Sequence, residues 1–252
     1  MYMETLDCMT VIIMGVTVLL VLSLKFVRFY IILFGKSLTF YEQLNQYSKV
    51  IPASILFPFK LGELFRMYCY GYQLGNFIEG IICILFDRFM DTIALLTIII
   101  GVQFFYKAKI SVIVIVLLMF SIGIFVIYNT FRPLYMFWNN YFICSPGSRR
   151  KLIALLFLEK CNDAYNSVEK TITGKFLILY LLSATAWVVE LGGLTVVNIV
   201  NGRGRLLDCI FTYLTAALTG QHNTYMSVFT VISIIGSFCM YGLCKIYRTI
   251  KQ

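Results

Sequence analysis

The sequence predicts an all-α fold: a polytopic helical bundle integral to a membrane, with re-entrant or broken helices. Of the 252 residues, 60% are hydrophobic and only 13% are charged, whereas a soluble domain is about 45–50% apolar and about 25% charged. Mean hydropathy is +0.85, and long uncharged apolar runs recur along the chain. These observations exclude an ordinary soluble globule and a disordered tail.

The net charge of +9 does not indicate a nucleic-acid partner, because the basic residues lie between apolar runs rather than on one polar face. Such a distribution is typical of the positive-inside bias of multi-pass membrane proteins. We therefore expect a cell-membrane protein with its acidic N-terminus outside and its basic C-terminus in the cytoplasm. Basic loops of this kind attract lipids with anionic headgroups.

The first crossing is predicted from the uncharged apolar run 8–24, which continues as an apolar stretch to Phe34. A helix of this length crosses a bilayer. Lys25 and Arg28 lie toward its end, where long basic side chains can extend to a membrane interface. A second crossing is predicted over 74–106, although that stretch carries charged residues.

Between these two crossings, the stretch 50–72 does not fit one clean membrane-spanning helix. Pro52 and Pro58 each remove a backbone donor and bend or stop a helix. Non-helical backbone at membrane depth persists only where it is buried in protein or lines a wet cavity. The stretch is therefore predicted to form a re-entrant hairpin whose second arm begins near Leu61.

Three more crossings are predicted in the second half of the chain. The cleanest is 110–131, which has no charged residue and is expected to end at Arg132 and Pro133. The other two are 176–200 and 225–244. The stretch 206–220 is short for a crossing. The prediction is thus about five full spans plus two half-length elements.

We expect residues 1–252 to form a single transmembrane domain in which 132–175 is a long basic connection. Its seven basic and three acidic residues place it in the cytoplasm by the positive-inside rule. It is also expected to contain an amphipathic helix. The apolar side of that helix recurs at helical spacing through Phe157, Cys161, Ala164 and Val168.

Cysteine and histidine usage predicts neither a metal site nor a cofactor. None of the eight cysteines forms a C-x-x-C pair, and most lie in apolar runs, where cysteine behaves as a small hydrophobe. The one histidine, His222, has no neighbouring cluster of cysteines or carboxylates. We expect no disulfide framework and no bound metal.

Charged residues within apolar stretches are the candidates for function, because ionisable groups in a membrane are costly and usually face a bundle interior or a wet cavity. Glu63 and Arg66 can pair along one helix. Asp87 and Asp91 share a helix face and repel each other, which invites a cation that Arg66 or Lys60 is expected to supply. The candidate binding residues are Lys60, Glu63, Arg66, Asp87, Arg88, Asp91 and Glu190.

Three interpretations of this cluster stay open. A half-helix beginning near Leu61 can aim its N–H groups at an anion while basic side chains add donors to a phosphate. Alternatively, the charges form a structural lock between the hairpin and the next helix, or they lie at the membrane interface. Glu190 stands alone in the stretch 176–200, and it either completes the cluster or pairs with groups near Lys175.

Two of the charged motifs resemble those of a known family. The first motif, P-x-x-x-G-E-x-x-R, consists of Pro58, Gly62, Glu63 and Arg66. The second, D-R-x-x-D, consists of Asp87, Arg88 and Asp91. The chain is similar here to the lysylphosphatidylglycerol synthase transmembrane-region family, also called flippase-like, which has the first motif followed by E-R-x-x-D. Trp187 to Glu190 resembles a later W-x-x-E segment. The family's P-G-G-x-G-x-x-E element is replaced by residues 218–225, LTGQHNTY.

The resemblance implies a lipid translocase, or a component of one, that handles a phosphate-containing lipid or lipid-linked sugar in cell-envelope biogenesis. Lys60, Arg66 and Arg88 would hold the phosphate, and Pro58 and Gly62 would shape the broken hairpin. Aminoacyl transfer in the family's two-domain members belongs to a soluble C-terminal domain. Because this chain ends soon after its last predicted span, we expect a transport or accessory protein rather than an enzyme.

Two alternative functions remain open. The first is a membrane-embedded transferase that uses a lipid-phosphate-linked donor, with Asp87 or Asp91 as base or metal ligand. The second is a non-catalytic membrane subunit that positions a partner enzyme through the basic connection.

Overall fold

The computed structural model describes residues 8–36, 38–56, 61–106, 112–144, 149–200, 209–210, 212–214 and 224–251. The secondary structure in these ranges is helical and includes no strand, which confirms the all-α prediction. Three helices are long and apolar enough to cross a membrane: Met9–Leu33, Val114–Cys144 and Phe176–Val200. The predicted count of about five spans is not confirmed.

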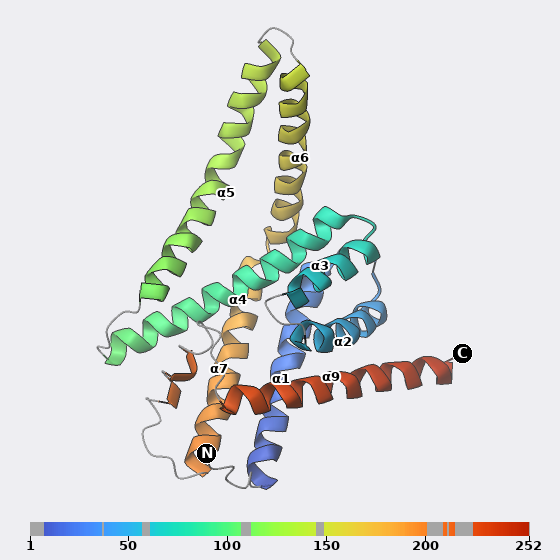
Figure 1. Cartoon of the computed structure of the whole chain (residues 1–252), viewed down its shortest axis with the longest axis vertical. Coiled ribbons are helices and arrows are strands. Elements are labelled where there is room, and N and C mark those ends of the chain that lie inside the picture. The colour runs from blue at the N-terminus through green and yellow to red at the C-terminus, as the bar shows by residue number, and fades with distance from the viewer. Residues whose placement is uncertain are drawn as a thin grey trace. The chain divides into compact units, whose positions relative to one another are not determined.

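The chain divides into two compact units (Figure 1). Residues 1–99 and 177–252 form the first unit, and residues 100–176 form the second. The first unit holds α1 (Cys8–Leu33), α2 (Phe40–Leu56), α3 (Leu61–Gln73), most of α4 (Phe77–Tyr106), nearly all of α7 (Phe176–Val200) and α9 (Thr224–Lys251). The second holds the end of α4, then α5 (Val112–Cys144) and α6 (Arg149–Ile172).

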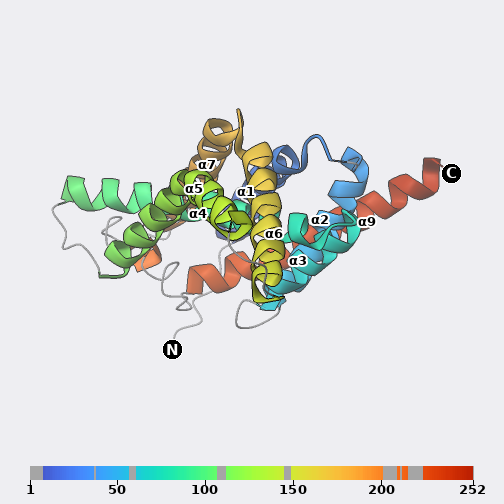
Figure 2. The ribbon, with the colours of Figure 1, turned by 90° about the horizontal axis from the view of Figure 1, so that it is seen from above.

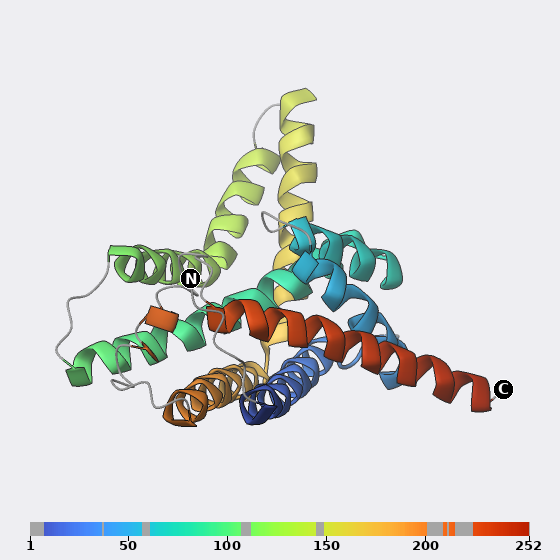
Figure 3. The same cartoon turned by 60° about the horizontal axis from the view of Figure 1, so that its bottom comes forward.

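In the first unit, α1 and α7 lie side by side (Figures 1 and 3). Their bounds agree closely with the predicted crossings at 8–34 and 176–200. The two helices approach closely where Gly193 of α7 faces Thr17 of α1, because a Cβ atom at Gly193 would overlap the threonine side chain. This close packing, which small residues permit in membrane helices, brings polar groups of α1 and α7 within reach of each other.

The predicted hairpin consists of α2 and α3, and its second arm begins at Leu61 as expected. Pro52 lies within α2 and does not end it, although it removes one backbone donor. At the start of α3, Gly62 packs directly against the backbone of Ser54, so that even a Cβ atom would clash there. The packing of the two arms therefore depends on a glycine at position 62, while the re-entrant position in a membrane stays a prediction.

A capping box fixes the start of α2. The Thr39 backbone N–H and hydroxyl each donate to a Glu42 carboxylate oxygen at 2.9 Å, and the Glu42 N–H donates to the Thr39 hydroxyl at 3.4 Å. Such reciprocal bonds satisfy amides that would otherwise lack a partner at a helix N-terminus. The backbone and hydroxyl donors of Thr39 lower the pKa of the Glu42 carboxyl from its ordinary value.

Helix α9 packs along α2 and α1, and α3 packs against α2, so that α2, α3 and α9 gather closely (Figure 2). The apolar part of α9, Ser227–Gly242, is shorter than a full crossing. Helix α4 carries several charged residues and is not among the three candidate crossings. The spans predicted over 74–106 and 225–244 are thus present as helices, but as crossings they remain predictions.

In the second unit, one prediction about a helix end is wrong. The helix was expected to end at Arg132 and Pro133, yet α5 continues through both residues to Cys144. A proline removes one backbone hydrogen bond, but the apolar and aromatic residues after Pro133 continue the helix. The segment predicted as a polar connection over 132–175 therefore begins with the last part of α5.

The amphipathic helix predicted in that segment corresponds to α6. Its Tyr165 ring stacks on Tyr128 and Phe131 of α5, with ring centroids 5.2 and 4.8 Å away. Cys161, Ala164 and Val168 are half-buried as expected, whereas Phe157 is exposed. The apolar stripe is thus half-buried only from Cys161 onward.

Candidate functional site

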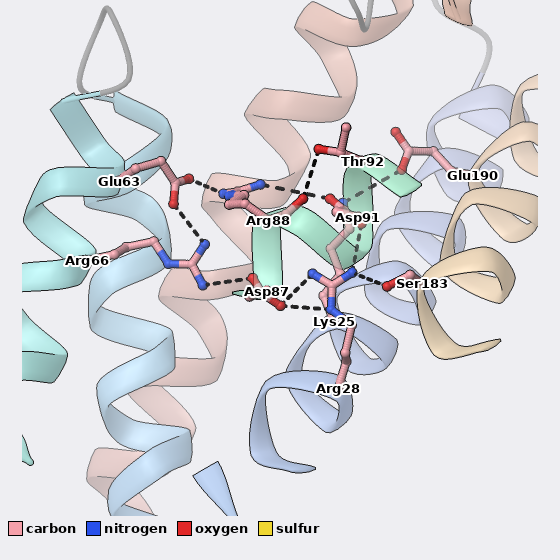
Figure 4. Close-up of polar contacts among 10 residues, drawn as sticks. All are labelled: Lys25, Arg28, Glu63, Arg66, Asp87, Arg88, Asp91, Thr92, Ser183 and Glu190. Carbon is pink, nitrogen blue, oxygen red and sulfur yellow. Dashed lines mark hydrogen bonds and ion pairs between the residues drawn. The ribbon is translucent and has the colours of Figure 1, made fainter. Parts of the chain in front are cut away.

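A network of charged and polar side chains forms inside the first unit, where α1, α3, α4 and α7 meet (Figure 4). We call it the charge network. Each of its four carboxylates lies within 4 Å of at least one basic side chain. Its members are Lys25, Arg28, Glu63, Arg66, Asp87, Arg88, Asp91, Ser183 and Glu190.

The centre of the network is Arg28, whose side chain is only 2% exposed. Its Nε and Nη2 atoms lie 2.8 and 2.7 Å from Asp87 Oδ1, and its Nη1 donates at 2.7 Å to both Asp91 Oδ1 and Ser183 Oγ. We call these four residues the Arg28 centre. One guanidinium thereby joins α1 to α4 and α7.

The sequence correctly indicated that Asp87 and Asp91 invite a cation, but it named the wrong one. The bridging cation is Arg28 of α1 rather than Arg66 or Lys60. Arg28 was expected to reach a membrane interface because it lies near the end of an apolar run. It instead points into the bundle, where an unpaired charge would be costly and two carboxylates compensate it.

Arg66 of α3 supports the centre from the other side. Its Nη2 lies 3.4 Å from Asp87 Oδ2, and its Nη1 lies 3.4 Å from Glu63 Oε2. The second contact confirms the pairing predicted from the three-residue spacing of Glu63 and Arg66. The Arg66 guanidinium also lies over the ring of Phe29, 5.4 Å from its centroid, which is a favourable cation–π geometry. Arg66 is therefore buried and held by partners on three helices.

Arg88 and Glu63 form the exposed side of the network, which we call the Arg88 edge. An Arg88 Nη2 donor contacts Glu63 Oε1 directly, and Nη1 lies 3.9 Å from Asp91 Oδ2. The side chain of Arg88 is 46% exposed, against 23% for Glu63. The edge is thus the part of the network with the most exposed side chain.

Glu190 of α7 joins the network through α1. Its Oε2 lies 3.9 Å from Lys25 Nζ, and its Oε1 accepts a hydrogen bond from the hydroxyl of Tyr213. Of the two partners proposed from the sequence, the charge cluster and the groups near Lys175, the structure brings Glu190 to the cluster. The link is Lys25, a residue that the sequence placed at an interface.

Two residues of the predicted site, Lys60 and Pro58, lie outside the described residues, as does His222, which was not part of that site. Gly62 is described and has the tight packing role given above. Within the described ranges, no group of three or more histidine, cysteine, aspartate or glutamate side chains is placed to hold a metal ion.

Most of the network stabilises the fold, as the expected free energies of its ion pairs indicate. Removing one member of a buried, hydrogen-bonded ion pair costs about 3–5 kcal/mol, because an uncompensated charge stays behind. Exposed pairs contribute about 0–1 kcal/mol. The Arg28 centre belongs to the first class and the Arg88 edge is closer to the second.

Comparison of this chain with protein-family models, curated proteins and solved structures found no match.

Proposed function

We propose that this protein binds a lipid with a phosphate-containing headgroup and acts as a lipid translocase, or as a component of one, in cell-envelope biogenesis. The observation that carries the proposal is the half-exposed side chain of Arg88 at the edge of a mostly buried charge network. Three helices long enough to cross a membrane support a lipid as the ligand.

Arg88 suits a phosphate because a guanidinium offers parallel donors that match two phosphate oxygens. In the structure, Glu63 accepts a hydrogen bond from Arg88 and neutralises it. A phosphate would displace this carboxylate, which is itself partly exposed and can return to water. Glu63 thus acts as an internal competitor that keeps the site neutral when no lipid is bound.

The other two arginines support the site from within. Arg28 already donates to two carboxylates and a hydroxyl, and Arg66 is buried between Glu63 and Asp87. They hold α1, α3, α4 and α7 together around the edge. The polar interior would offer a charged headgroup a route across the hydrocarbon layer. Charged groups in that layer are costly unless they are paired or face a wet cavity.

The finer membrane arrangement is part of the proposal. We propose that α4 and α9 add two crossings to the three apolar helices, giving five, and that the C-terminus lies in the cytoplasm. The basic tail at Lys245, Arg248 and Lys251 supports this orientation. A single cysteine placed at the C-terminus of a cysteine-free variant should resist a membrane-impermeant thiol reagent in intact cells. Labelling from outside the cell would show that the C-terminus lies outside instead.

The first test is native mass spectrometry with lipid extraction on the purified protein. A phosphate-headed lipid should co-purify with the wild type and be lost from Arg88→Gln. Arg132→Gln is the matched control, because Arg132 is an exposed arginine of α5 with one long ion pair, 4.0 Å to Glu169. Equal lipid retention by the wild type and Arg88→Gln would overturn the proposed site.

The second test separates a translocase from a binding subunit. The protein is reconstituted into vesicles that contain a fluorescent phosphate-headed lipid, and a membrane-impermeant reductant reports how fast the lipid changes leaflet. Wild-type protein should accelerate the exchange, and Arg88→Gln should not. Lipid binding that depends on Arg88 without any acceleration would favour the alternative of a non-catalytic subunit that presents lipid to a partner enzyme.

A further inference from the structure

We infer that Lys25, Trp187 and Glu190 form a binding site for a hydroxyl-bearing group, of the kind found on the glycerol or sugar part of a lipid headgroup. This inference rests on the proposed function and deepens it by naming the chemical class of the headgroup. The three residues come from α1 and α7, away from the Arg88 edge, which is built by α3 and α4.

Two buried polar atoms at this place have no hydrogen-bond partner among the described residues. They are the indole Nε1 of Trp187 and the carboxylate Oε2 of Glu190. Most buried polar atoms in proteins are hydrogen-bonded, since leaving one unpaired costs about 1–3 kcal/mol. A donor and an acceptor left open together therefore indicate that something outside the chain completes them.

Trp187 and Glu190 lie on one side of α7 because they are three residues apart. Lys25 of α1 reaches both residues: its Nζ lies 3.9 Å from Glu190 Oε2 and 5.9 Å from the centroid of the Trp187 ring. The ion pair is longer than a hydrogen bond, so it leaves Oε2 free to accept one. Figure 4 shows Lys25 and Glu190 approaching each other from the two helices.

The site is buried, and Lys25 is its most exposed member. Trp187 and Glu190 are buried, whereas the Lys25 side chain is 29% exposed. Tyr213 already donates to the other oxygen of Glu190, which holds the carboxylate in place. A ligand would therefore enter past the Lys25 side chain.

The chemistry of the open atoms selects a hydroxyl. An indole N–H can only donate and a carboxylate can only accept, so one group that both accepts and donates satisfies them together. A hydroxyl does this, and Lys25 can donate to a second one. A phosphate would be repelled by Glu190, and an ammonium group has no lone pair for the indole N–H.

The site overlaps the charge network, of which Lys25 and Glu190 are members, and Lys25 lies about one turn from Arg28 on α1. Arg28 is bonded to Asp91, and Asp91 lies 3.9 Å from Arg88. On this inference, one headgroup places its phosphate at Arg88 and its hydroxyls toward Glu190. This division assigns charge recognition to α3 and α4, and hydroxyl recognition to α1 and α7.

The test compares two lipids that differ only in hydroxyl groups. Phosphatidylglycerol and phosphatidylpropanol carry the same phosphodiester charge and the same three-carbon headgroup, but the second lacks both hydroxyls. Binding of each is measured by native mass spectrometry of the detergent-solubilised full chain. The wild type should prefer phosphatidylglycerol by about tenfold, as expected for one or two hydrogen bonds to a buried polar site.

Trp187→Phe removes the indole N–H and keeps an aromatic ring, and it should reduce the preference to about threefold or less without weakening binding of phosphatidylpropanol. Trp138→Phe is the matched control, because Trp138 is the other tryptophan of the chain and lies exposed on α5. It should retain the wild-type preference. Thermal unfolding of both variants checks that the fold is intact.

The outcomes separate this inference from the proposed function. Equal binding of the two lipids by the wild type would overturn the inference and assign the open atoms to water, and this result needs no variant. An unchanged preference in Trp187→Phe would also overturn it. Arg88→Gln should weaken binding of both lipids alike, and if it does not, the phosphate site fails while a preference that depends on Trp187 still supports the hydroxyl site.

Discussion

The Arg28 centre and the Arg88 edge are built from the same kinds of side chain, yet they differ in how exposed those side chains are. Arg28 is 2% exposed and donates to two carboxylates and a serine from two other helices. Arg88 is 46% exposed and its closest partner is one partly exposed glutamate. The centre therefore holds helices together, whereas the edge remains open to exchange its partner.

This difference shows how a single charge network can serve two purposes. In the buried centre, each charge is compensated at close range, and loss of one partner leaves the others stranded in an apolar bundle. At the edge, the ion pair competes with water and contributes little to stability. A ligand can therefore replace a partner at the edge without unfolding the protein.

The largest effect is expected from Arg28→Met. This change removes the closest cation from Asp87 and Asp91, which are both buried, and leaves them only the longer contacts to Arg66 and Arg88. It should lower the free energy of unfolding by about 3–5 kcal/mol. Denaturant titration of the purified protein in detergent measures the loss. Arg132→Met, at an exposed position of α5, should cost less than about 1 kcal/mol. Similar losses in the two variants would show that the centre does not lock the helices.

The second effect concerns the contact between α2 and α3, which sets the position of Arg66 and Glu63. Gly62→Ala places a methyl group against the Ser54 backbone and should destabilise the protein by about 1–3 kcal/mol. Gly192→Ala is the control, because a Cβ atom there meets no atom within 4 Å and alanine favours helix. If both variants unfold at the same denaturant concentration, the close approach of α3 to α2 is not required.

A third, smaller effect should appear in binding and sharpens the contrast at the edge. Glu63→Gln removes the carboxylate that competes for Arg88, so affinity for a phosphate-headed lipid should rise about threefold, which corresponds to the modest strength of a partly exposed ion pair. Lipid titration by native mass spectrometry checks this. Weaker binding than in the wild type would mean that Glu63 contacts the ligand rather than competing with it.

The smallest effect is expected at the start of α2, which has no part in the charge network. The Glu42 carboxylate has a lowered pKa, so its contribution to the cap is present above the ordinary glutamate pKa and is lost as the pH falls through the lowered value. Glu42→Ala should speed hydrogen exchange of the Thr39 amide at neutral pH, because that amide loses its acceptor. An unchanged exchange rate would exclude the capping box in solution.

The sequence predicted the helices well where apolar runs were long and uncharged. Helices α1 and α7 lie where they were expected, and α3 begins at Leu61. The prediction failed at Pro133, which lies inside α5, because one missing hydrogen bond does not outweigh a run of apolar residues that continues the helix. Local breaking signals are thus weaker than the pattern that surrounds them.

The site could be predicted in its acidic half and only partly in its basic half. Spacing along one helix predicted that Glu63 pairs with Arg66, and it placed Asp87 and Asp91 on one helix face. It could not identify Arg28, which lies 59 residues from Asp87 in the chain, because only packing of α1 against α4 and α7 brings them together. A basic residue inside a predicted span is itself a signal, since a buried charge needs a partner.

The most direct test of the contrast between centre and edge measures stability and lipid binding on the same preparations of Arg28→Met and Arg88→Met. We predict that Arg28→Met lowers the free energy of unfolding by several kcal/mol. Arg88→Met should change that free energy by less than about 1 kcal/mol and lose binding of the phosphate-headed lipid. If Arg88→Met unfolds as readily as Arg28→Met, or keeps wild-type lipid binding while folded, the edge is part of the lock and the account is contradicted.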